Sequence, residues 1–259
     1  MKVVIFAGGI GSRISEESHL RPKPMIEIGG KPILWHIMKI YLAQGYNDFV
    51  VCLGYKGYMI KEYFMNYFLH NSDISIDIHH NEVEVLETKT ESFKVTLVDT
   101  GLNTKTAGRL KRVRSFLNEE RFMLTYGDGV SDINLKTLIK AHSDGGRLAT
   151  LTAIQTEGRF GSLVMGANGC TVESFMEKPK GDGLWINGGF FVLEPGVFNY
   201  LGDDADDVMW EDAPLNALTA DGELNAYRHY GFWKCMDAMR DRIELEEMWA
   251  GNQPKWKIW

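Results

Sequence analysis

The chain has 259 residues, enough for one large domain or two small ones with a core that needs no disulfides. Hydrophobic residues make up 44% and charged residues 24%, which is typical of globular proteins and excludes a disordered or fibrous chain. The net charge of −7 argues against binding to nucleic-acid phosphates or to an anionic membrane surface.

The cysteines indicate a reducing compartment. Cys52, Cys170 and Cys235 lie far apart and form no CxxC pair, so the sequence predicts neither a disulfide framework nor a zinc knuckle. The N-terminal apolar run is too short for a signal peptide, and no uncharged stretch approaches the roughly 20 residues of a membrane span. We therefore expect a cytoplasmic protein.

The first third of the chain alternates strand and helix patterns. Lys2–Ala7 is a short apolar run before glycines, which predicts a buried strand. Apolar residues at helical spacing predict a helix over Ile33–Leu42, and Phe49–Leu53 predicts the next strand. Tyr58–Leu69 follows as an aromatic-rich helix. This order is typical of a parallel sheet covered on both faces.

The middle of the chain changes character. Ile74–His79, Val83–Leu86 and Val95–Val98 alternate apolar and polar residues, which predicts half-exposed, antiparallel strands. Leu110–Leu117 predicts a helix, and Phe122–Tyr126 a buried strand.

The last part adds more strands and a closing helix. Ala149–Gln155 and Ser162–Met176 are β-rich, Gly188–Leu193 predicts a buried strand, and Arg240–Trp249 predicts a helix. No repeat or linker marks a boundary, so we expect one mixed α/β domain over residues 1–259.

A glycine-rich loop follows the first strand. Its sequence is GGIGSR, which lacks the third glycine of the dinucleotide fingerprint, since Ile14 stands there, and lacks the GK[ST] of a Walker A motif. Residues 1–40 carry six Lys or Arg against three Asp or Glu, and prolines flank Lys23 on both sides. The loop and Lys23 fit a polyphosphate site. A tight turn with a solvated lysine is the alternative.

Carboxylates offer candidate metal ligands. Asp128 lies between two glycines directly after a buried strand, where α/β folds bind ligands and where Mg²⁺ finds carboxylate oxygen. A turn aspartate that bonds only its own backbone is the alternative. The sequence leaves two roles for Asp237, a metal ligand or a cap of the last helix. The run Asp203–Glu223 holds eight acids and no Lys or Arg, which predicts a solvated surface.

An ordered set of motifs resembles the sugar-1-phosphate nucleotidyltransferases, and within them the cytidylyltransferases that act on glucose 1-phosphate. The motifs span nearly the whole chain and read AGGIGSR, RPKPMIEIGGKPILWHIM, YKGYMIKEYF, VTLVDTG, GRLKRV, YGDGV, GRFGSL, FMEKPKGDG, INGGFFVLEP and FWKCMDAMRD. Single motifs such as EKP are weak, whereas the ordered set is specific.

This resemblance implies a fold and a reaction. The fold is the Rossmann-like nucleotide-diphospho-sugar transferase fold, a mixed, mostly parallel sheet flanked by helices with a β-rich insertion. The reaction is Mg²⁺-assisted transfer of a cytidylyl group from CTP to α-D-glucose 1-phosphate, which yields CDP-glucose and pyrophosphate for deoxysugars of surface polysaccharide. Such a transfer needs positioning and charge neutralisation rather than a protein nucleophile. We expect a homo-oligomer that binds neither nucleic acid nor membrane.

The resemblance also assigns roles to residues. Residues 1–130 should mainly bind the nucleotide and residues 131–259 the sugar phosphate. The nucleotide would be held by Ala7, Gly8, Gly9, Ile10, Gly11, Ser12, Arg13, Lys23, Thr106, Arg109 and Gly127. Thr106 and Arg109 match the cytidine-reading segment. The catalytic residues would be Lys23, Arg13 and Asp128, and the metal ligands Asp128 and Asp237. The sugar phosphate would be held by Glu177, Lys178, Asn187 and Gly188.

Three alternatives remain open. TEGRFG at 156–161, Trp185 and Ala238 depart from the family pattern, which leaves room for another base or sugar. A glycosyltransferase of similar fold would carry an Asp-x-Asp motif, which Val130 breaks here. A non-catalytic sensor of sugar nucleotides would be expected to have lost Lys23, Asp128 or Asp237.

Overall fold

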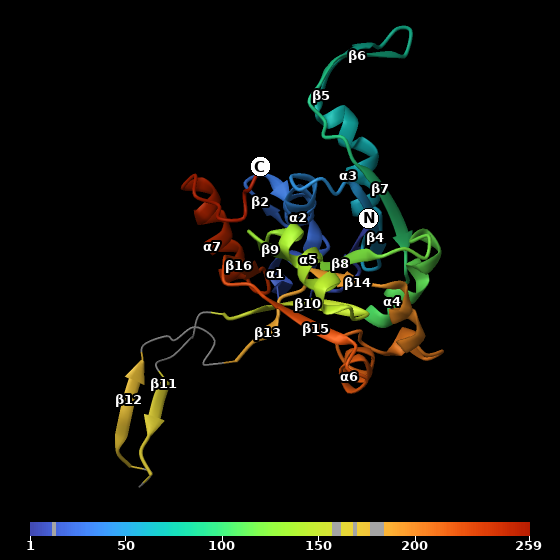
Figure 1. Ribbon diagram of the computed structural model, residues 1–259. Helices are drawn as coiled ribbons and strands as arrows, with labels where there is room; N and C mark the ends of the chain where they lie inside the picture. Colours follow the sequence, from blue (N-terminus) through green and yellow to red (C-terminus); the bar gives the residue numbers. More distant parts are fainter. Residues whose placement is uncertain (12–13, 157–161, 168–169, 177–183) are drawn as a thin grey trace.

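A mostly parallel sheet runs through the middle of the protein in the computed structural model, which describes residues 1–11, 14–156, 162–167, 170–176 and 184–259 (Figure 1). The helices of these residues are α1 (Ser15–Ser18), α2 (Ile33–Leu42), α3 (Gly57–His70), α4 (Thr106–Val113), α5 (Leu135–Gly145), α6 (Ala213–Ala220) and α7 (Met239–Ala250). The strands are β1 (Val3–Phe6), β2 (Glu27–Ile28), β3 (Lys31–Pro32), β4 (Asp48–Leu53), β5 (Ser72–Asp77), β6 (Glu82–Thr88), β7 (Lys94–Asp99), β8 (Phe122–Tyr126), β9 (Gly129–Ser131), β10 (Ala149–Ile154), β11 (Ser162–Met165), β12 (Val172–Met176), β13 (Ile186–Asn187), β14 (Phe191–Leu193), β15 (Leu224–Arg228) and β16 (Trp233–Cys235).

The main sheet has the order β13-β10-β14-β8-β1-β4-β7, and β15 pairs with β10. β1 is central and runs parallel to both β4 and β8. β14 runs antiparallel to β8 and to β10, which makes the sheet mixed. The expected α/β fold with a mixed, mostly parallel sheet is therefore confirmed.

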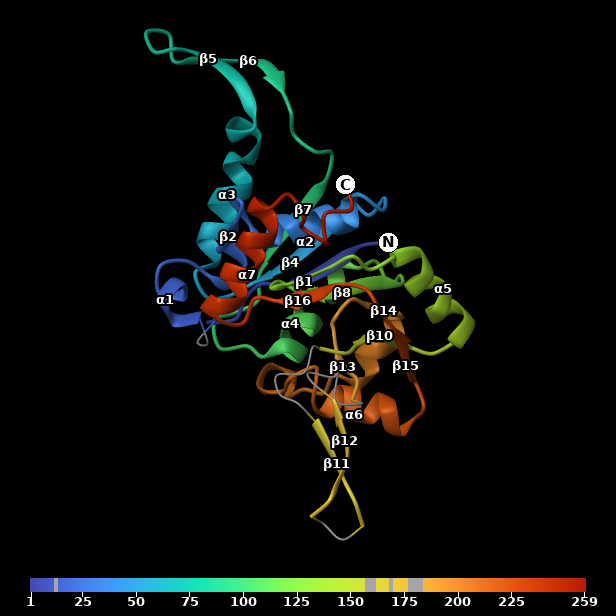
Figure 2. The ribbon, with the colours of Figure 1, turned by 90° about the vertical axis from the view of Figure 1, so that its left-hand side faces the viewer.

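Helices cover both faces of this sheet. Along β1, Val3 and Ile5 join one buried cluster, whereas Val4 and Phe6 join the other, because side chains alternate across a strand. The first cluster includes residues of α2, α5 and α7, and the second includes residues of α4 and α6 (Figure 2). A strand buried on both faces needs a continuous apolar run, which the β1 sequence VVIF supplies.

Four two-stranded sheets of the described residues lie outside the main sheet, and two of them are the ribbons β5–β6 and β11–β12. β5 pairs antiparallel with β6 at the end of α3, and this ribbon stands away from the body in both views (Figures 1 and 2). β11 pairs antiparallel with β12 in the β-rich segment predicted for residues 162–176. No helix of the described residues is long and apolar enough to cross a membrane.

Several predicted elements are confirmed at or near their bounds. α2 and β8 match their predicted ranges, and β1, β4, α3, β10 and α7 differ from theirs by one residue at one or both ends. The antiparallel ribbon predicted from the alternation around residues 74–86 is present as β5 and β6.

Other predictions were wrong. Val95–Val98 was predicted to be antiparallel, but it lies in β7, which pairs in parallel with β4 at the edge of the main sheet. Alternation reports which side chains face water and says nothing about the pairing partner. The helix predicted over Leu110–Leu117 begins earlier, at Thr106; the α-helix ends at Val113 and a 3-10 helix continues over Arg114–Phe116. The strand predicted over Gly188–Leu193 is shorter, since Gly189 and Phe190 both have positive φ.

Candidate active site

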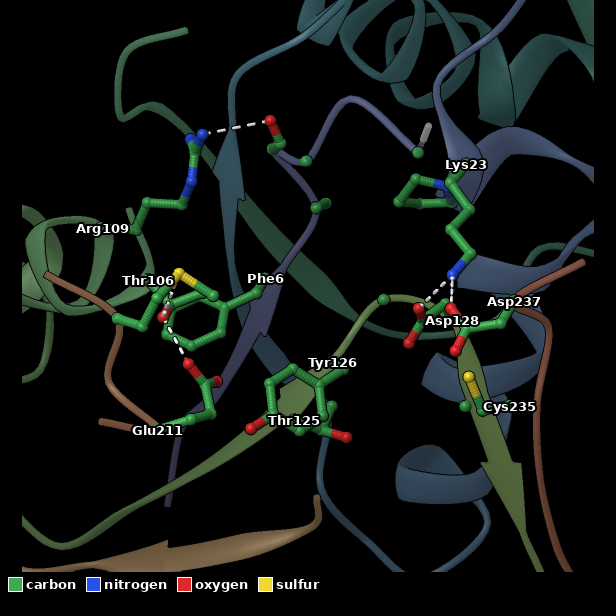
Figure 3. A pocket seen from close by; sticks show the side chains of 18 of the residues that line it. Phe6, Lys23, Thr106, Arg109, Thr125, Tyr126, Asp128, Glu211, Cys235 and Asp237 are labelled. Atoms are coloured by element: carbon green, nitrogen blue, oxygen red, sulfur yellow. Dashed lines mark hydrogen bonds and ion pairs between the residues drawn. The ribbon is translucent and has the colours of Figure 1, made fainter. Parts of the chain in front are cut away.

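A cavity of about 1230 Å³ opens at the carboxyl ends of β1 and β8 (Figure 3). This is the edge of the sheet where α/β folds place their ligands. The cavity brings together, from six parts of the chain, every predicted site residue that the structure describes: Ala7, Gly8, Gly9, Ile10, Gly11, Lys23, Thr106, Arg109, Gly127, Asp128, Asn187, Gly188 and Asp237. Ser12, Arg13, Glu177 and Lys178 lie outside the described residues.

The glycine loop after β1 forms one wall of the cavity. A Cβ at Gly8 would come within 2.1 Å of Arg109 Nη1, so only glycine fits there without displacing that side chain. Gly11 has a φ of +70°, which also favours glycine. The backbone N–H of Tyr55 donates to the Gly8 carbonyl at 3.1 Å and ties the loop to the end of β4. The loop is therefore held in place by the segment that follows β4.

Arg109 fixes this loop from the side. Its side chain is only 4% exposed, and Nη1 donates to the carbonyls of Leu53 and Gly101, each at 2.9 Å, and to Thr100 Oγ1 at 2.7 Å. Nη2 donates to the Gly8 carbonyl at 3.1 Å. The guanidinium lines the cavity, yet its terminal nitrogens bond to the protein's own backbone. Its described contacts are those of a residue that positions the loops around the cavity.

Thr106 begins α4 and leads to an acid that the sequence analysis missed. Its hydroxyl donates to Glu211 Oε2 at 2.7 Å and accepts from the backbone N–H of Trp210 at 2.8 Å. Glu211 lines the cavity, although it belongs to the acidic run predicted to be solvated. Nothing in that run distinguishes Glu211 from its neighbours except the adjacent Trp210, which is fully buried.

Tyr126 lies in the cavity beside Glu211 (Figure 3). Burial raises the pKa of Tyr126, and the nearby Glu211 carboxylate raises this pKa further. The Tyr126 hydroxyl accepts a hydrogen bond from Asn187 Nδ2 at 3.0 Å. Asn187 Oδ1 in turn accepts from the backbone N–H of Gly189 at 2.9 Å, and Trp233 Nε1 donates to the Gly188 carbonyl at 2.7 Å. These bonds fix Asn187 and Gly188 at the cavity wall.

Lys23 joins the two candidate metal ligands. Its ammonium lies 2.6 Å from Asp128 Oδ2 and 2.6 Å from Asp237 Oδ1 (Figure 3). Burial by itself would lower the pKa of Lys23, but the charge of Asp128 and the bonds to both carboxylates outweigh it and raise the pKa. Lys23 is therefore a fixed cation at neutral pH.

Asp237 does not act as the helix cap that the sequence left open. The backbone N–H groups of Asp237 and Ala238 both donate to Asp241 Oδ2, at 3.1 and 2.9 Å. Asp241 thus caps the start of α7, which leaves the carboxylate of Asp237 in the cavity next to Lys23.

A third donor lies beside the two carboxylates. Cys235 ends β16, which pairs with β9 so that Cys235 lies opposite Gly129. Ligand atoms of Asp128, Cys235 and Asp237 all lie within 4.8 Å of one another. Burial raises the pKa of the Cys235 thiol, and the Asp128 carboxylate raises this pKa further.

Comparison with known proteins places these features in a family. The family model described as nucleotidyl transferase matches residues 2–234. A protein of Salmonella typhimurium strain LT2 named glucose-1-phosphate cytidylyltransferase is 53% identical over 260 residues, covering 100% of both chains. A Bacillus subtilis strain 168 protein named probable glucose-1-phosphate cytidylyltransferase is 47% identical over 259 residues, also covering 100% of both chains. The crystal structure of HddC from Yersinia pseudotuberculosis has the same fold, with a TM-score of 0.69 at 24% identity, covering 96% of this chain and 99% of that one.

Proposed function

Because the chain belongs to the nucleotidyl transferase family, we propose that it transfers a cytidylyl group from CTP to α-D-glucose 1-phosphate and releases pyrophosphate. One observation carries the choice of substrates: 53% identity over the whole length to a protein named glucose-1-phosphate cytidylyltransferase. The cavity supports the chemistry, since it joins a glycine loop, a fixed lysine and a carboxylate pair at one edge of the sheet.

The two substrates occupy different parts of the cavity. The nucleotide lies against the glycine loop Ala7–Gly11, the segment around Thr106 and the loops that Arg109 holds. The sugar phosphate lies against Asn187 and Gly188. The division of the chain into a nucleotide part before residue 130 and a sugar part after it is part of this proposal. For Ser12, Arg13, Glu177 and Lys178, the roles at the triphosphate and the sugar phosphate rest on the motifs that contain them.

The reaction needs two anions brought together and charge neutralised as pyrophosphate leaves. The sugar phosphate oxygen attacks the α-phosphorus of CTP, and pyrophosphate departs in line. Lys23 lines the cavity with its ammonium fixed, so it contacts phosphate oxygens at the reacting centre without a cost of reorganisation. Backbone N–H groups of the glycine loop supply further donors.

The carboxylate pair fits Mg²⁺. Asp128 and Asp237 offer oxygen ligands, and Mg²⁺ is usually held by one or two carboxylates together with water and substrate phosphates. These two residues would hold the ion. When bound, Mg²⁺ supplies positive charge that stabilises the transferring phosphoryl group and the leaving pyrophosphate.

The test crosses a panel of nucleoside triphosphates with a panel of sugar 1-phosphates and measures pyrophosphate release. We expect CTP with glucose 1-phosphate to have the highest kcat/KM, with discrimination against dTTP on the order of 10²-fold, because an unpaired polar group in the base pocket is costly. Equal kcat/KM for CTP, UTP and dTTP would contradict the choice of base. If no pair of substrates releases pyrophosphate, the proposal that the chain catalyses this transfer is wrong.

The assembly and compartment are also part of the proposal. The chain works as a homo-oligomer in the cytoplasm, where nucleoside triphosphates are available. Support for a second copy comes from the ribbon of β5 and β6, in which Ile76 pairs with Val83 and Ile74 with Val85 on one face. Ile76 is 53% and Val83 56% exposed, and two such faces packed about a two-fold axis cover each other. The opposite face pairs Asp77 with Glu82 and Asp73 with Glu87, which keeps that face in water.

A further inference from the structure

A cysteine thiol that the proposed reaction does not use lies beside the carboxylate pair at Lys23. Cys235 reaches the same point of the cavity from β16, and its sulfur lies beside both carboxylates (Figure 3). The backbone holds it there by two links to the Asp128 segment. Cys235 lies opposite Gly129 in the β9–β16 pair, and the N–H of Met236 donates to the Asp128 carbonyl at 2.9 Å.

The three donor atoms suit a cation other than Mg²⁺. Their mutual separations are within 4.8 Å, and a tetrahedral ion with roughly 2.0 Å bonds to oxygen and 2.3 Å to sulfur needs them roughly 3.5 Å apart. Rotation of the side chains covers that difference. Thiolate sulfur is a ligand for Zn²⁺ and similar soft ions, whereas Mg²⁺ takes oxygen ligands. Among the described residues, Asp128, Cys235 and Asp237 form the group of three or more His, Cys, Asp or Glu side chains whose ligand atoms lie close enough together to hold one metal ion.

The site already accommodates positive charge. The Lys23 ammonium lies 2.6 Å from one oxygen of each carboxylate, so two negative groups converge on one point beside the sulfur. An ion bound there competes with Lys23 for both carboxylates. Removal of the ammonium should therefore strengthen the binding of such an ion.

We propose that Asp128, Cys235 and Asp237 form a binding site for thiophilic divalent cations such as Zn²⁺ and Cd²⁺, with Cys235 Sγ as a ligand, and that such an ion takes the place of Mg²⁺ at the two carboxylates and stops the reaction. The consequence for catalysis rests on the proposed function, because that function places Mg²⁺ and Lys23 at the same carboxylates. Coordination releases the thiol proton to the buffer, since the thiolate is the metal ligand.

The test uses Cd²⁺ itself as the probe and the full chain as the protein. Cd²⁺ bound to thiolate gives an ultraviolet charge-transfer band, which is read in a titration without substrates. We expect one equivalent of Cd²⁺ to produce the band in the wild type. In C235S the band disappears, and Cd²⁺ affinity falls by more than the roughly 10- to 100-fold that a lost outer-shell partner costs. C170S is the matched control, because Cys170 is exposed, and it keeps the band.

Two further variants separate this site from binding by a cysteine alone. In D237N the band remains but Cd²⁺ binds more weakly, because a charged oxygen ligand is lost. In K23A, Cd²⁺ binds more tightly, on the order of tenfold or more, because the competing ammonium is absent. Circular dichroism checks that each variant is folded, and C235A replaces C235S if the latter is not.

The outcomes distinguish this inference from the proposed function. A band that persists in C235S, a band lost in C170S, or unchanged Cd²⁺ affinity in both D237N and K23A overturns the site. The absence of any band in the wild type overturns it as well. The turnover panel with Mg²⁺ decides the proposed function separately, so an active enzyme without the Cd²⁺ band leaves that function intact and refutes only this site.

Discussion

Lys23 contacts two carboxylates that come from distant parts of the chain, at 2.6 Å each. Its pKa is raised despite burial, so the ammonium stays charged at any pH at which the enzyme is assayed. Because charge grows on the phosphates as the bond breaks, a cation held at that place stabilises the transition state more than the bound substrates.

We predict that Lys23→Ala lowers kcat by on the order of 10²–10³, the size of losing one preorganised donor. KM for CTP should change much less. Steady-state kinetics with CTP and glucose 1-phosphate measures both, and Lys31→Ala serves as a control with the same loss of charge outside the carboxylate pair. A raised KM with unchanged kcat would mean that Lys23 only binds the nucleotide.

Asp237 and Asp241 provide a matched pair for a second prediction. Asp237 contacts Lys23, whereas Asp241 accepts from the backbone N–H groups of Asp237 and Ala238 just before α7. We expect Asp237→Asn to raise the Mg²⁺ concentration at half-maximal rate and to leave the melting temperature nearly unchanged. Asp241→Ala should lower stability by about 0.5–2 kcal/mol, as the loss of a cap does.

The double variant tests whether the carboxylates act as a unit. Asp128→Asn combined with Asp237→Asn should be scarcely slower than the poorer single variant, because effects on a shared ion do not add. A Mg²⁺ titration of all three variants gives the answer. Fully additive losses, or a Mg²⁺ dependence unaltered by Asp237→Asn, would remove Asp237 from the metal site.

At the scale of elements, α4 holds the cavity together through one buried side chain. Arg109 joins α4 to the end of β4 and to the glycine loop through the carbonyls of Leu53, Gly101 and Gly8. Its neighbour Arg112 lies on the exposed side and pairs with Asp206 on the surface. The two arginines therefore differ in burial while sharing a helix.

We predict that Arg109→Ala costs about 2–4 kcal/mol in the free energy of unfolding, because it removes buried hydrogen bonds to the carbonyls of Leu53, Gly101 and Gly8. It should also raise KM for CTP, since the glycine loop loses its support. Arg112→Ala should cost no more than about 1 kcal/mol, as exposed ion pairs do. Urea unfolding of both variants makes the comparison, and equal losses would show that Arg109 is not a positioning residue.

The ribbon of β5 and β6 gives a prediction for assembly. A lone two-stranded ribbon is marginally stable in water, so an exposed apolar face on it is best explained by contact with a second copy. We expect the combined change Ile76→Asp and Val83→Asp to shift the protein toward monomer in analytical ultracentrifugation. Glu84→Gln, on the opposite face, should leave the assembly intact. A wild-type protein that sediments as a monomer would contradict the proposal.

The elements also show how far the sequence could be interpreted. Apolar spacing placed Ile33–Leu42 and Phe122–Tyr126 at their observed bounds, because both are buried and their patterns are complete. It could not give the parallel pairing of Val95–Val98, which depends on where β4 lies. α6 and β15 went unpredicted because α6 lies inside the acidic run, β15 directly follows it, and neither has a full apolar face.

The candidate site shows the same limit: most of its residues could be predicted from the sequence, but their contacts could not. The motifs identified the residues that surround the cavity, since loops after buried strands converge at one edge. Glu211 was missed, because its place in the cavity depends on Trp210 packing into the core. The bonds of Arg109 to backbone carbonyls depend on three-dimensional contacts that no spacing reports.

At the scale of the whole molecule, a buried histidine connects the start of α2 to the C-terminal segment. His36 is fully buried among Trp35, Trp249 and Trp256, and its Nε2 bonds to the Ile28 carbonyl at 2.8 Å. Burial lowers the pKa of His36 to about 4. The unfolded chain, with an ordinary histidine pKa of about 6.5, binds a proton that the folded chain excludes.

Stability should therefore fall as the pH falls from about 6.5 towards 4, by up to about 3 kcal/mol from this group. Above about pH 6.5 the contribution is fully present, because both states are then neutral. Urea unfolding followed by tryptophan fluorescence across this range measures the slope. His36→Gln should flatten it, and burial lowers the pKa of His142 too, so His142→Gln calibrates a second contribution of the same sign. An unchanged slope in His36→Gln would contradict the assignment.

The two carboxylates that hold Lys23 leave the ribosome at different times. Asp128 follows β8, and Asp237 is added about 110 residues later. At about 5–20 residues per second, the nascent chain spends roughly 5–20 s with the first carboxylate and without the second. During that interval β1, β4 and β8 can pair and present the glycine loop, but the reacting centre has half of its negative charge. The carboxylate pair around Lys23 is therefore complete only when the segment that carries Asp237 has been made.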